Sequence, residues 1–327
     1  MLRRLRYITP VLGLIAATVW TTAVHAETYP VKTATIVTPY SSGGSVDAVA
    51  RMVAEELHAS LGQTFIVENR VGAFGNIAAD FVAKAKADGY TLLVHNASAV
   101  ASSISAFKNL PFDPRKDFVP VAIVAHQPGV LVTNPSLPVK TVEEFIAYAK
   151  SKPGKLNYGV GGIFGPTHTP AVLFSMKTGI QSEPVMYKGA APAIIDLVGG
   201  QIDFMFDTAP TSLPFIKDGR LRVLAVTSAG RLDSLPDVPT ISESGVAGYE
   251  FNSWIGMSAP SGTPKEVVAK LNAEINKMLS KNSFRKRLAD YGLEASKGES
   301  PEEFRAFIDT EIDLYADIVK ASGIPPQ

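Results

Sequence analysis

Residues 34–57 read ATIVTPYSSGGSVDAVARMVAEEL and divide into a strand, a loop with two glycines and a helix. The run at 35–37 is short and β-branched, which is typical of a buried strand. The apolar residues after the loop recur at helical spacing, and Gly62 follows them as a helix-ending residue. A strand, a short loop and a helix in this order form the unit of a parallel α/β sheet.

The same alternation continues along the chain and predicts an α/β fold. We expect further strands at 65–67, 91–94, 121–124, 130–132, 156–159, 202–206, 223–226 and 254–257. Helices are expected at 77–85, at about 168–176, and after three capping boxes that begin at Thr141, Thr263 and Ser300. Since no low-complexity linker separates these elements, discontinuous domains joined by two crossovers are plausible.

Length and composition exclude several classes of protein. The chain has 327 residues, which favours two domains over one core. Charged residues are 19% of the chain and hydrophobic residues 46%, so the chain is not disordered. The formal net charge is zero, which argues against a nucleic-acid partner. The absence of cysteine excludes disulfides, thiolate metal sites, cysteine nucleophiles and a lipidated anchor.

The amino-terminal segment predicts export. Arg3, Arg4 and Arg6 precede a short apolar run, and small residues stand at Val24 and Ala26. This is the pattern of a secretory signal peptide cleaved after Ala26, which would place the mature protein in the periplasm. An uncleaved anchor helix is disfavoured, because Pro10 interrupts an apolar segment that is already short for a membrane span.

The loop at 38–47 is the first candidate site. Gly43 and Gly44 allow a ligand to approach the backbone, and Ser45 stands where the helix begins. A helix N-terminus at the carboxyl edge of a parallel sheet is a natural anion site. The local pattern is equally typical of an ordinary tight turn with Ser45 as the helix cap.

The segment at 158–168 repeats this arrangement about 120 residues later. Its glycines at 159, 161 and 165 match a loose dinucleotide fingerprint, which is a weak signal alone. An exported protein has little use for a nicotinamide cofactor, and no P-loop lysine follows the glycines. His168 stands at a helix start, where it could donate to an anion or cap the helix.

A third segment, at 186–207, offers two charged candidates. Lys188 could pair with an anion or lie on the surface beside a turn glycine. Asp207 ends a strand, where ligand-contacting residues of α/β sheets are found, or it caps the helix that follows. The sequence contains no nucleophile elbow, HExxH pair or P-loop, and its histidines lack the spacing of a metal site. We therefore expect no enzyme activity, no metal and no cofactor.

Several of these segments together resemble a known family. They are the glycine pair at 43–44 with Asp47, VENR at 67–70, ADGYTL at 87–92, YKG at 187–189, DLVGGQID at 196–203, LPDVPT at 235–240 and APSGTP at 259–264. The chain resembles the periplasmic substrate-binding proteins of tripartite tricarboxylate transporters, the TctC or Bug family, over essentially its whole mature length. The resemblance implies a two-lobed type II periplasmic-binding-protein fold, each lobe a mainly parallel sheet flanked by helices. It also implies a first lobe of residues 27–127 and 253–327, and a second lobe of residues 128–252.

The resemblance further implies that the two glycine loops, one per lobe, grip a ligand carboxylate with backbone N–H groups, hydroxyls and ordered water. The candidate ligand-binding residues are Tyr40, Ser41, Ser42, Gly43, Gly44, Ser45, Asp47, Asn96, Ser98, Gly161, Gly162, Phe164, Gly165, Thr167, His168, Tyr187 and Asp207. The second loop departs from the small, hydroxyl-rich pattern of the family at Ile163, Phe164 and Pro166. These residues disfavour citrate-like ligands and leave room for an aromatic or medium-chain acid.

The expected function is that of a monomeric periplasmic solute-binding protein. It would capture a small organic carboxylate, either a dicarboxylate or an aromatic acid, and deliver it to the membrane permease of a tripartite tricarboxylate transporter. A periplasmic carboxylate sensor that passes its closed state to a membrane receptor is the alternative, and a periplasmic hydrolase is a weaker one.

Overall fold

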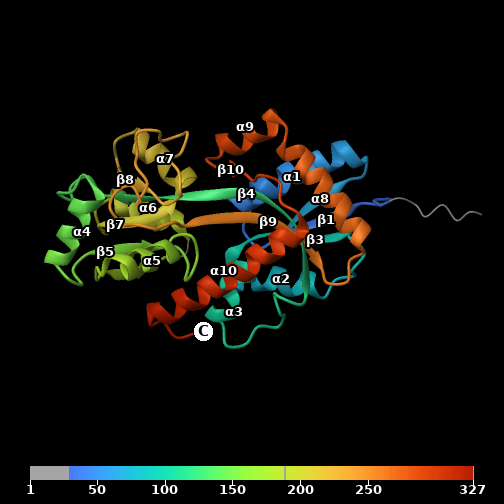
Figure 1. The fold of residues 1–327 in the computed structure, drawn as a ribbon, viewed down its shortest axis with the longest axis horizontal. Coiled ribbons are helices and arrows are strands. Elements are labelled where there is room, and N and C mark those ends of the chain that lie inside the picture. The colour runs from blue at the N-terminus through green and yellow to red at the C-terminus, as the bar shows by residue number, and fades with distance from the viewer. Residues whose placement is uncertain (1–28, 188, 327) are drawn as a thin grey trace, which may run out of the picture.

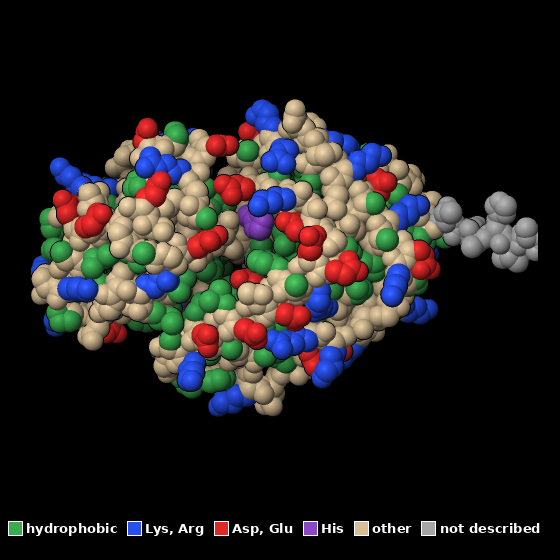
Figure 2. Space-filling view, viewed as in Figure 1, with side chains coloured by type: hydrophobic (Ala, Val, Ile, Leu, Met, Phe, Trp, Pro, Cys, Tyr) green, Lys and Arg blue, Asp and Glu red, His purple; other side chains and the backbone are tan. Residues whose placement is uncertain are grey.

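A computed structural model describes residues 29–187 and 189–326 as two α/β lobes that lie side by side (Figure 1). The predicted signal peptide lies outside these residues. The strands follow the order β2-β1-β3-β9-β4-β7-β5-β6, with β10 and β8 also paired to β4. Figure 2 shows a hollow where the two lobes meet and charged side chains spread over their outer surfaces.

The first lobe is built on β1 (Ala34–Thr38), which pairs in parallel with both β2 (Phe65–Asn69) and β3 (Thr91–Asn96). Its helical segments are α1 (Ser45–Leu61), α2 (Asn76–Ala83), η2 (Ser98–Ser102) and α3 (Ser103–Ala106). Gly62 ends α1 in the left-handed conformation, with φ of 73°, as the sequence predicts. The sheet therefore presents the carboxyl ends of β1 and β3, and the start of α1, at one edge.

The strand β4 (Phe118–Thr133) joins the two lobes. Its residues 118–128 pair antiparallel with β9 (Asn252–Pro260), and residues 129–133 pair antiparallel with strands of the second lobe. The sequence-based prediction of two separate strands here was wrong. Pro128 lies where pairing with β9 ends, and the chain stays extended there while it changes partners.

The second lobe contains four further strands and four helices. The strands are β5 (Asn157–Val160), β6 (Glu183–Met186), β7 (Phe204–Thr208) and β8 (Arg222–Val226). The helices are α4 (Val142–Ser151), α5 (Thr169–Thr178), α6 (Ala190–Val198) and α7 (Ala209–Lys217). β5 runs parallel to β6 and β7, whereas β7 and β8 run antiparallel to β4.

The chain then returns to the first lobe. Its remaining elements are α8 (Lys265–Leu279), α9 (Asn282–Asp290), the short β10 (Glu294–Ala295) and α10 (Pro301–Ser322). Helices α8 and α9 bury their apolar faces in the first-lobe core, and α10 crosses below β9 toward α3 (Figure 1). The pairing of β4 with β9 ends at Pro128 and Asn252, and the lobe boundaries near 127/128 and 252/253 stay a prediction.

Of the three predicted capping boxes, one is complete in the structure, one is partial and one is absent. At α10 the box is complete, because Ser300 and Glu303 each accept the backbone N–H of the other. At α4, Thr141 accepts from the Glu144 N–H, but Glu144 accepts from Lys140 instead. The box predicted at Thr263 was wrong: its hydroxyl donates to the Pro260 carbonyl, and α8 begins after Pro264 without a side-chain cap.

Candidate functional site

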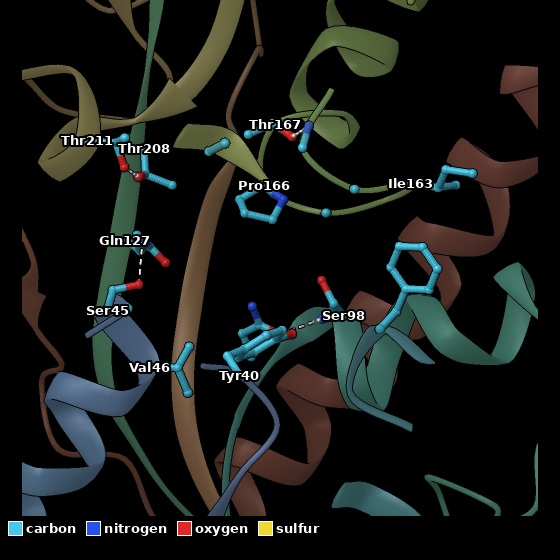
Figure 3. Close-up of a pocket in the computed structure, with 17 residues that line it drawn as sticks. Tyr40, Ser45, Val46, Ser98, Gln127, Ile163, Pro166, Thr167, Thr208 and Thr211 are labelled. Atoms are coloured by element: carbon cyan, nitrogen blue, oxygen red, sulfur yellow. Dashed lines mark hydrogen bonds between the residues drawn. The ribbon is translucent and has the colours of Figure 1, made fainter. Parts of the chain in front are cut away.

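A cavity of about 300 Å³ lies between the two lobes. Its lining residues are Tyr40, Gly44, Ser45, Val46, Phe74, Asn96, Ser98, Gln127, Gly161, Gly162, Ile163, Gly165, Pro166, Thr167, Ala190, Thr208 and Thr211. Figure 3 shows Ser45, Gln127, Thr208 and Thr211 on one side of this space and Ile163 on the opposite side. The size falls within the range of small-molecule sites.

The first-lobe wall of the cavity is the start of α1. Gly44 is the N-cap residue, with φ of −76°, and no side chain caps the helix. Ser45 is the first residue of the helix and not the cap that the sequence suggested, and its hydroxyl accepts a hydrogen bond from Gln127 Nε2 at 3.0 Å. The first-turn N–H groups of an α-helix have no intrahelical partner, so they remain available to a ligand here.

The buried Asp47 carboxylate fixes the loop that precedes α1. It accepts hydrogen bonds from the Arg51 guanidinium at 2.9 and 3.0 Å, from the Gly43 N–H at 3.0 Å and from Asn69 Nδ2 at 2.8 Å. Burial alone would raise the pKa of this carboxyl, but these hydrogen bonds outweigh burial and lower it to about 2. Asp47 is thus ionised and paired, and it holds the glycine loop in place without facing the cavity.

Tyr40 and the end of β3 form the floor of the cavity. The Tyr40 hydroxyl donates to Asn96 Oδ1 at 2.6 Å, and the same oxygen accepts from the Ser98 N–H at 3.1 Å. Burial raises the pKa of the Tyr40 hydroxyl to about 12, although its hydrogen bonds with Ser98 and Asn96 act in the opposite direction. The hydroxyl therefore stays protonated near neutral pH, and this wall adds polar groups without adding a charge.

The second-lobe wall is the glycine loop that follows β5. The Gly161 N–H donates to the Thr167 hydroxyl at 2.8 Å, which closes the loop on itself. A Cβ atom on Gly161 would lie 2.6 Å from the Ala190 backbone nitrogen, so only glycine permits this loop to rest against the start of α6.

His168 supports this loop from behind. Its Nδ1 accepts the Phe164 N–H at 3.1 Å, and its ring stacks on Tyr158 with the ring centroids 6.4 Å apart. Burial lowers the pKa of His168 to about 4, so the imidazole is neutral near pH 7 and can act as the acceptor in this bond. The residue does not line the cavity, and it holds the backbone of the loop.

Helix starts replace cationic side chains as the source of positive potential. Besides α1, the starts of α6 and α7 reach the cavity through Ala190, Thr208 and Thr211, and neither helix has a side-chain cap. The Thr208 and Thr211 hydroxyls bond each other at 2.9 Å. None of the lining residues that the structure describes is Lys, Arg or His, and Lys188, the candidate anion partner from the sequence, lies outside the described residues. Three converging N-termini favour a bound anion of low charge.

The cavity collects about half of the residues predicted from the sequence. Nine of the candidates line it: Tyr40, Gly44, Ser45, Asn96, Ser98, Gly161, Gly162, Gly165 and Thr167. Eight do not: Ser41, Ser42, Gly43, Asp47, Phe164, His168, Tyr187 and Asp207. Ser41, Ser42 and Gly43 are exposed on the outer side of the first loop.

Tyr187 and Asp207 each form a side-chain hydrogen bond with a neighbouring residue. The Tyr187 hydroxyl donates to Asp196 Oδ2 at 2.8 Å. Asp207 is fully buried at the end of β7, where its Oδ2 accepts from the Ser212 hydroxyl at 2.8 Å. Burial raises the pKa of Asp207 to about 6, despite hydrogen bonds from Ser212 and the Thr208 backbone. Neither residue lines the cavity.

Eight lining residues are not among the predicted ligand-binding residues, although the sequence singled out Ile163 and Pro166 as residues that affect ligand preference: Val46, Phe74, Gln127, Ile163, Pro166, Ala190, Thr208 and Thr211. Thr208 and Thr211 follow a correctly predicted strand, so the rule that ligands bind at strand carboxyl ends could have found them. Gln127 lies in the part of β4 that the prediction left between two strands. Phe74 had no sequence signal, because its place depends on a backbone conformation that phenylalanine rarely adopts.

The described residues contain neither a cluster of metal ligands nor a helix suited to crossing a membrane. In the stretches 29–187 and 189–326, no three His, Asp or Glu side chains gather as they would around a metal ion. Within the same stretches, no helix combines the length and the apolar character that crossing a membrane requires.

Comparison with known proteins identifies related sequences and structures. Residues 49–324 match the family model described as tripartite tricarboxylate transporter family receptor, TctC. Protein BugT of Bordetella pertussis is 36% identical over 315 residues, which is 96% of each chain. A solved structure of R. palustris Rpa4515 with adipate is 38% identical, with a TM-score of 0.83 over 91% of this chain and 100% of that one. MatC from Rhodopseudomonas palustris with bound malate is 33% identical, with a TM-score of 0.78 over 89% and 100%.

Proposed function

Because this chain belongs to the TctC family of tripartite tricarboxylate transporter receptors, we propose that it is a periplasmic solute-binding protein for a small organic carboxylate. It captures the acid between its two lobes and presents the closed complex to the permease of a tripartite tricarboxylate transporter. The predicted signal peptide would be cleaved after Ala26, so the mature protein would begin at Glu27.

The convergence of three uncapped helix N-termini on one interlobe cavity carries this proposal. Each N-terminus acts as a partial positive charge of about half a unit, which suits a carboxylate. The described part of the walls supplies hydroxyl, amide and backbone N–H donors and no Lys, Arg or His side chain. Such a site binds a carboxylate by dipoles, and it releases the acid when the lobes separate and water returns.

The ligands of related structures support a carboxylate over other anions. Rpa4515 was solved with adipate and MatC with malate, and both match nearly the whole length of this chain. The lining residues of the present cavity come from both lobes, so a bound acid contacts both walls at once. A ligand that bridges two lobes stabilises the closed arrangement by its contacts with the second wall.

A thermal-shift screen of the purified mature protein against carboxylic acids tests this function. The panel should contain monocarboxylates, dicarboxylates including adipate and malate, tricarboxylates and aromatic acids, with sugars and amines as controls. A ligand present at 100 times its dissociation constant stabilises the native state by about 2.7 kcal/mol, which is readily detected. The proposal fails if no carboxylate raises the melting temperature, or if only controls do.

A further inference from the structure

We propose that the end of the cavity formed by Phe74 and Ile163 is an apolar subsite, and that this chain prefers monocarboxylates with an apolar body over dicarboxylates. The inference rests on the proposed carboxylate-binding function and specifies its substrate class. In this arrangement the carboxylate lies among the helix starts of α1 and α7, and the alkyl chain or ring extends toward Phe74 and Ile163.

The two residues come from different lobes. Phe74 belongs to the first lobe and Ile163 to the glycine loop of the second, and both line the cavity. A Cβ atom on Gly162 would lie 3.7 Å from the Phe74 ring, so the ring rests against the opposite lobe. Figure 3 places Ile163 across the cavity from Ser45 and Gln127. Ser45, Gln127, Thr208 and Thr211 therefore lie on the side of the cavity away from Ile163, and Ser98 is a polar lining residue nearer the Ile163 side.

A buried cluster between the lobes supports this apolar end. Its members, here called the interlobe cluster, are Ala106, Phe164, Val172, Ile318 and Val319. Ile163 and Phe107 both pack against it, and the Phe107 ring centroid lies 5.9 Å from that of Phe74. Apolar side chains thus continue from the cavity wall into a dry region, where an ionised group would lose its hydration.

Backbone strain is concentrated at the same end. Within 29–187 and 189–326, the non-glycine residues with positive φ are Ala73 at 46°, Phe74 at 56° and Phe164 at 52°. Left-handed conformations cost free energy for residues with a side chain, and they persist where the surroundings enforce them, which is often at functional sites. Here the strained residues on each side of the cleft carry the aromatic rings that form or support the subsite.

The turn that presents Phe74 is held tightly. Gly72 and Gly75 flank the two strained residues with φ of 138° and 100°. A Cβ atom on Gly75 would lie 3.1 Å from Pro39 Cβ and 3.2 Å from Ala99 Cβ, so the turn packs directly on the loop before α1. The ring is therefore positioned by the same loop that leads to the helix start of α1.

Among the described residues, the second carboxylate of a dicarboxylate finds no charged partner at this end. The Phe74 and Ile163 side chains offer no hydrogen bond, and none of the described lining residues bears a positive charge. Burial of a terminal methyl group at this end lowers the free energy of binding through the hydrophobic effect. A carboxylate at the same place must either stay hydrated or lose its water without gaining a hydrogen-bond partner.

Calorimetric titration with hexanoate and adipate tests the inference. The two acids share a six-carbon chain and differ only in the group at the far end. We expect hexanoate to bind at least tenfold more tightly than adipate. Phe74→Asn should weaken hexanoate at least tenfold and change adipate less than threefold, because asparagine tolerates the left-handed backbone but removes the ring.

Phe81→Asn is the matched control. Phe81 lies on α2, stacks with the Arg70 guanidinium and does not line the cavity, so its loss should leave both affinities within threefold. Circular dichroism and the melting temperature verify folding of each variant. Ile163→Asn, on the other lobe, replaces Phe74→Asn if the latter does not fold, and it should show the same selective loss.

The outcomes separate this inference from the proposed function. Adipate binding as tightly as hexanoate or more tightly overturns the apolar subsite and leaves carboxylate binding intact. A preference for hexanoate that survives both Phe74→Asn and Ile163→Asn also overturns the assignment of the subsite. Failure of every acid in the thermal-shift panel overturns the proposed function itself.

Discussion

At the scale of single residues, two neighbouring glycines of the loop after β5 differ: Gly161 has no room for a side chain, whereas Gly162 has. A Cβ atom on Gly161 would meet backbone atoms, at 2.6 Å from the Ala190 nitrogen and 2.7 Å from the Gly189 carbonyl carbon. On the neighbouring Gly162, the nearest atoms would be the Phe74 ring carbons at 3.7 and 3.9 Å, which is ordinary contact.

These distances predict opposite results for two neighbouring substitutions. Gly161→Ala should weaken carboxylate binding at least tenfold and cost about 1–3 kcal/mol of stability, because backbone cannot move aside as a side chain can. Gly162→Ala should stay within threefold of the wild-type affinity. Calorimetry with an acid that binds in the screen, together with urea unfolding, measures both effects. Equal affinities for the two variants would show that the contact with α6 does not position the loop.

At the scale of elements, α10 contacts β9 at a glycine that lies beneath an aromatic ring. Phe304 of α10 covers Gly256, and the same ring packs edge-on against Trp254 with centroids 5.3 Å apart. Trp254 Nε1 donates to Glu311 of α10 at 2.9 Å, which fixes the helix along the strand. The long return helix is thereby joined to a strand that pairs with both β3 and β4.

Gly256→Ala should therefore destabilise the protein by about 1–3 kcal/mol through overpacking. Its Cβ would meet the Phe304 ring and lie 3.1 Å from the Ala122 carbonyl oxygen. In a Phe304→Leu background the same substitution should cost less, because the smaller side chain makes room. A double-mutant cycle in urea gives the coupling. Additive effects would show that the ring and the glycine do not constrain each other.

At the scale of the whole molecule, the interlobe cluster opposes separation of the lobes. Phe164 of the second lobe is 1% exposed and packs with Ile318 and Val319 of α10. Opening of the cleft would expose this ring to water, so burial of the cluster favours the closed arrangement even before a ligand binds.

Phe164→Ala should shift the ligand-free protein toward the open arrangement. Small-angle X-ray scattering should show a larger radius of gyration without ligand, and an unchanged value when an acid that binds in the screen saturates the site. Affinity should fall about fivefold to fiftyfold, since a smaller fraction of molecules is competent to bind. Phe164→Leu keeps most of the buried apolar surface and should have a smaller effect. An unaltered scattering curve with unaltered affinity would exclude a role for the cluster in closure.

The sequence by itself determined the α/β class, most of the strand and helix positions, and the two glycine loops. These features follow from local rules. They are the spacing of apolar residues along each segment, the left-handed Gly62 that ends α1, and the capping pair Ser300 and Glu303 that begins α10. The same reasoning found the loop that contains Gly161, Gly162 and Thr167, because a glycine loop before a helix is a local pattern, whereas the resemblance to the family named these residues as ligand-binding candidates.

Only the tertiary structure decided which side chains face the ligand space. Asp47, His168 and Asp207 have the chemistry of ligand-binding residues, yet each bonds a neighbour behind the wall. Gln127 lines the cavity because β4 continues unbroken from one sheet to the other, and pairing partners far apart in sequence hold it extended. Phe74 lines it through a left-handed backbone that its own sequence disfavours and that packing on Pro39 and Ala99 enforces. Long-range packing overrides local preference at these positions, so no local pattern could reveal them.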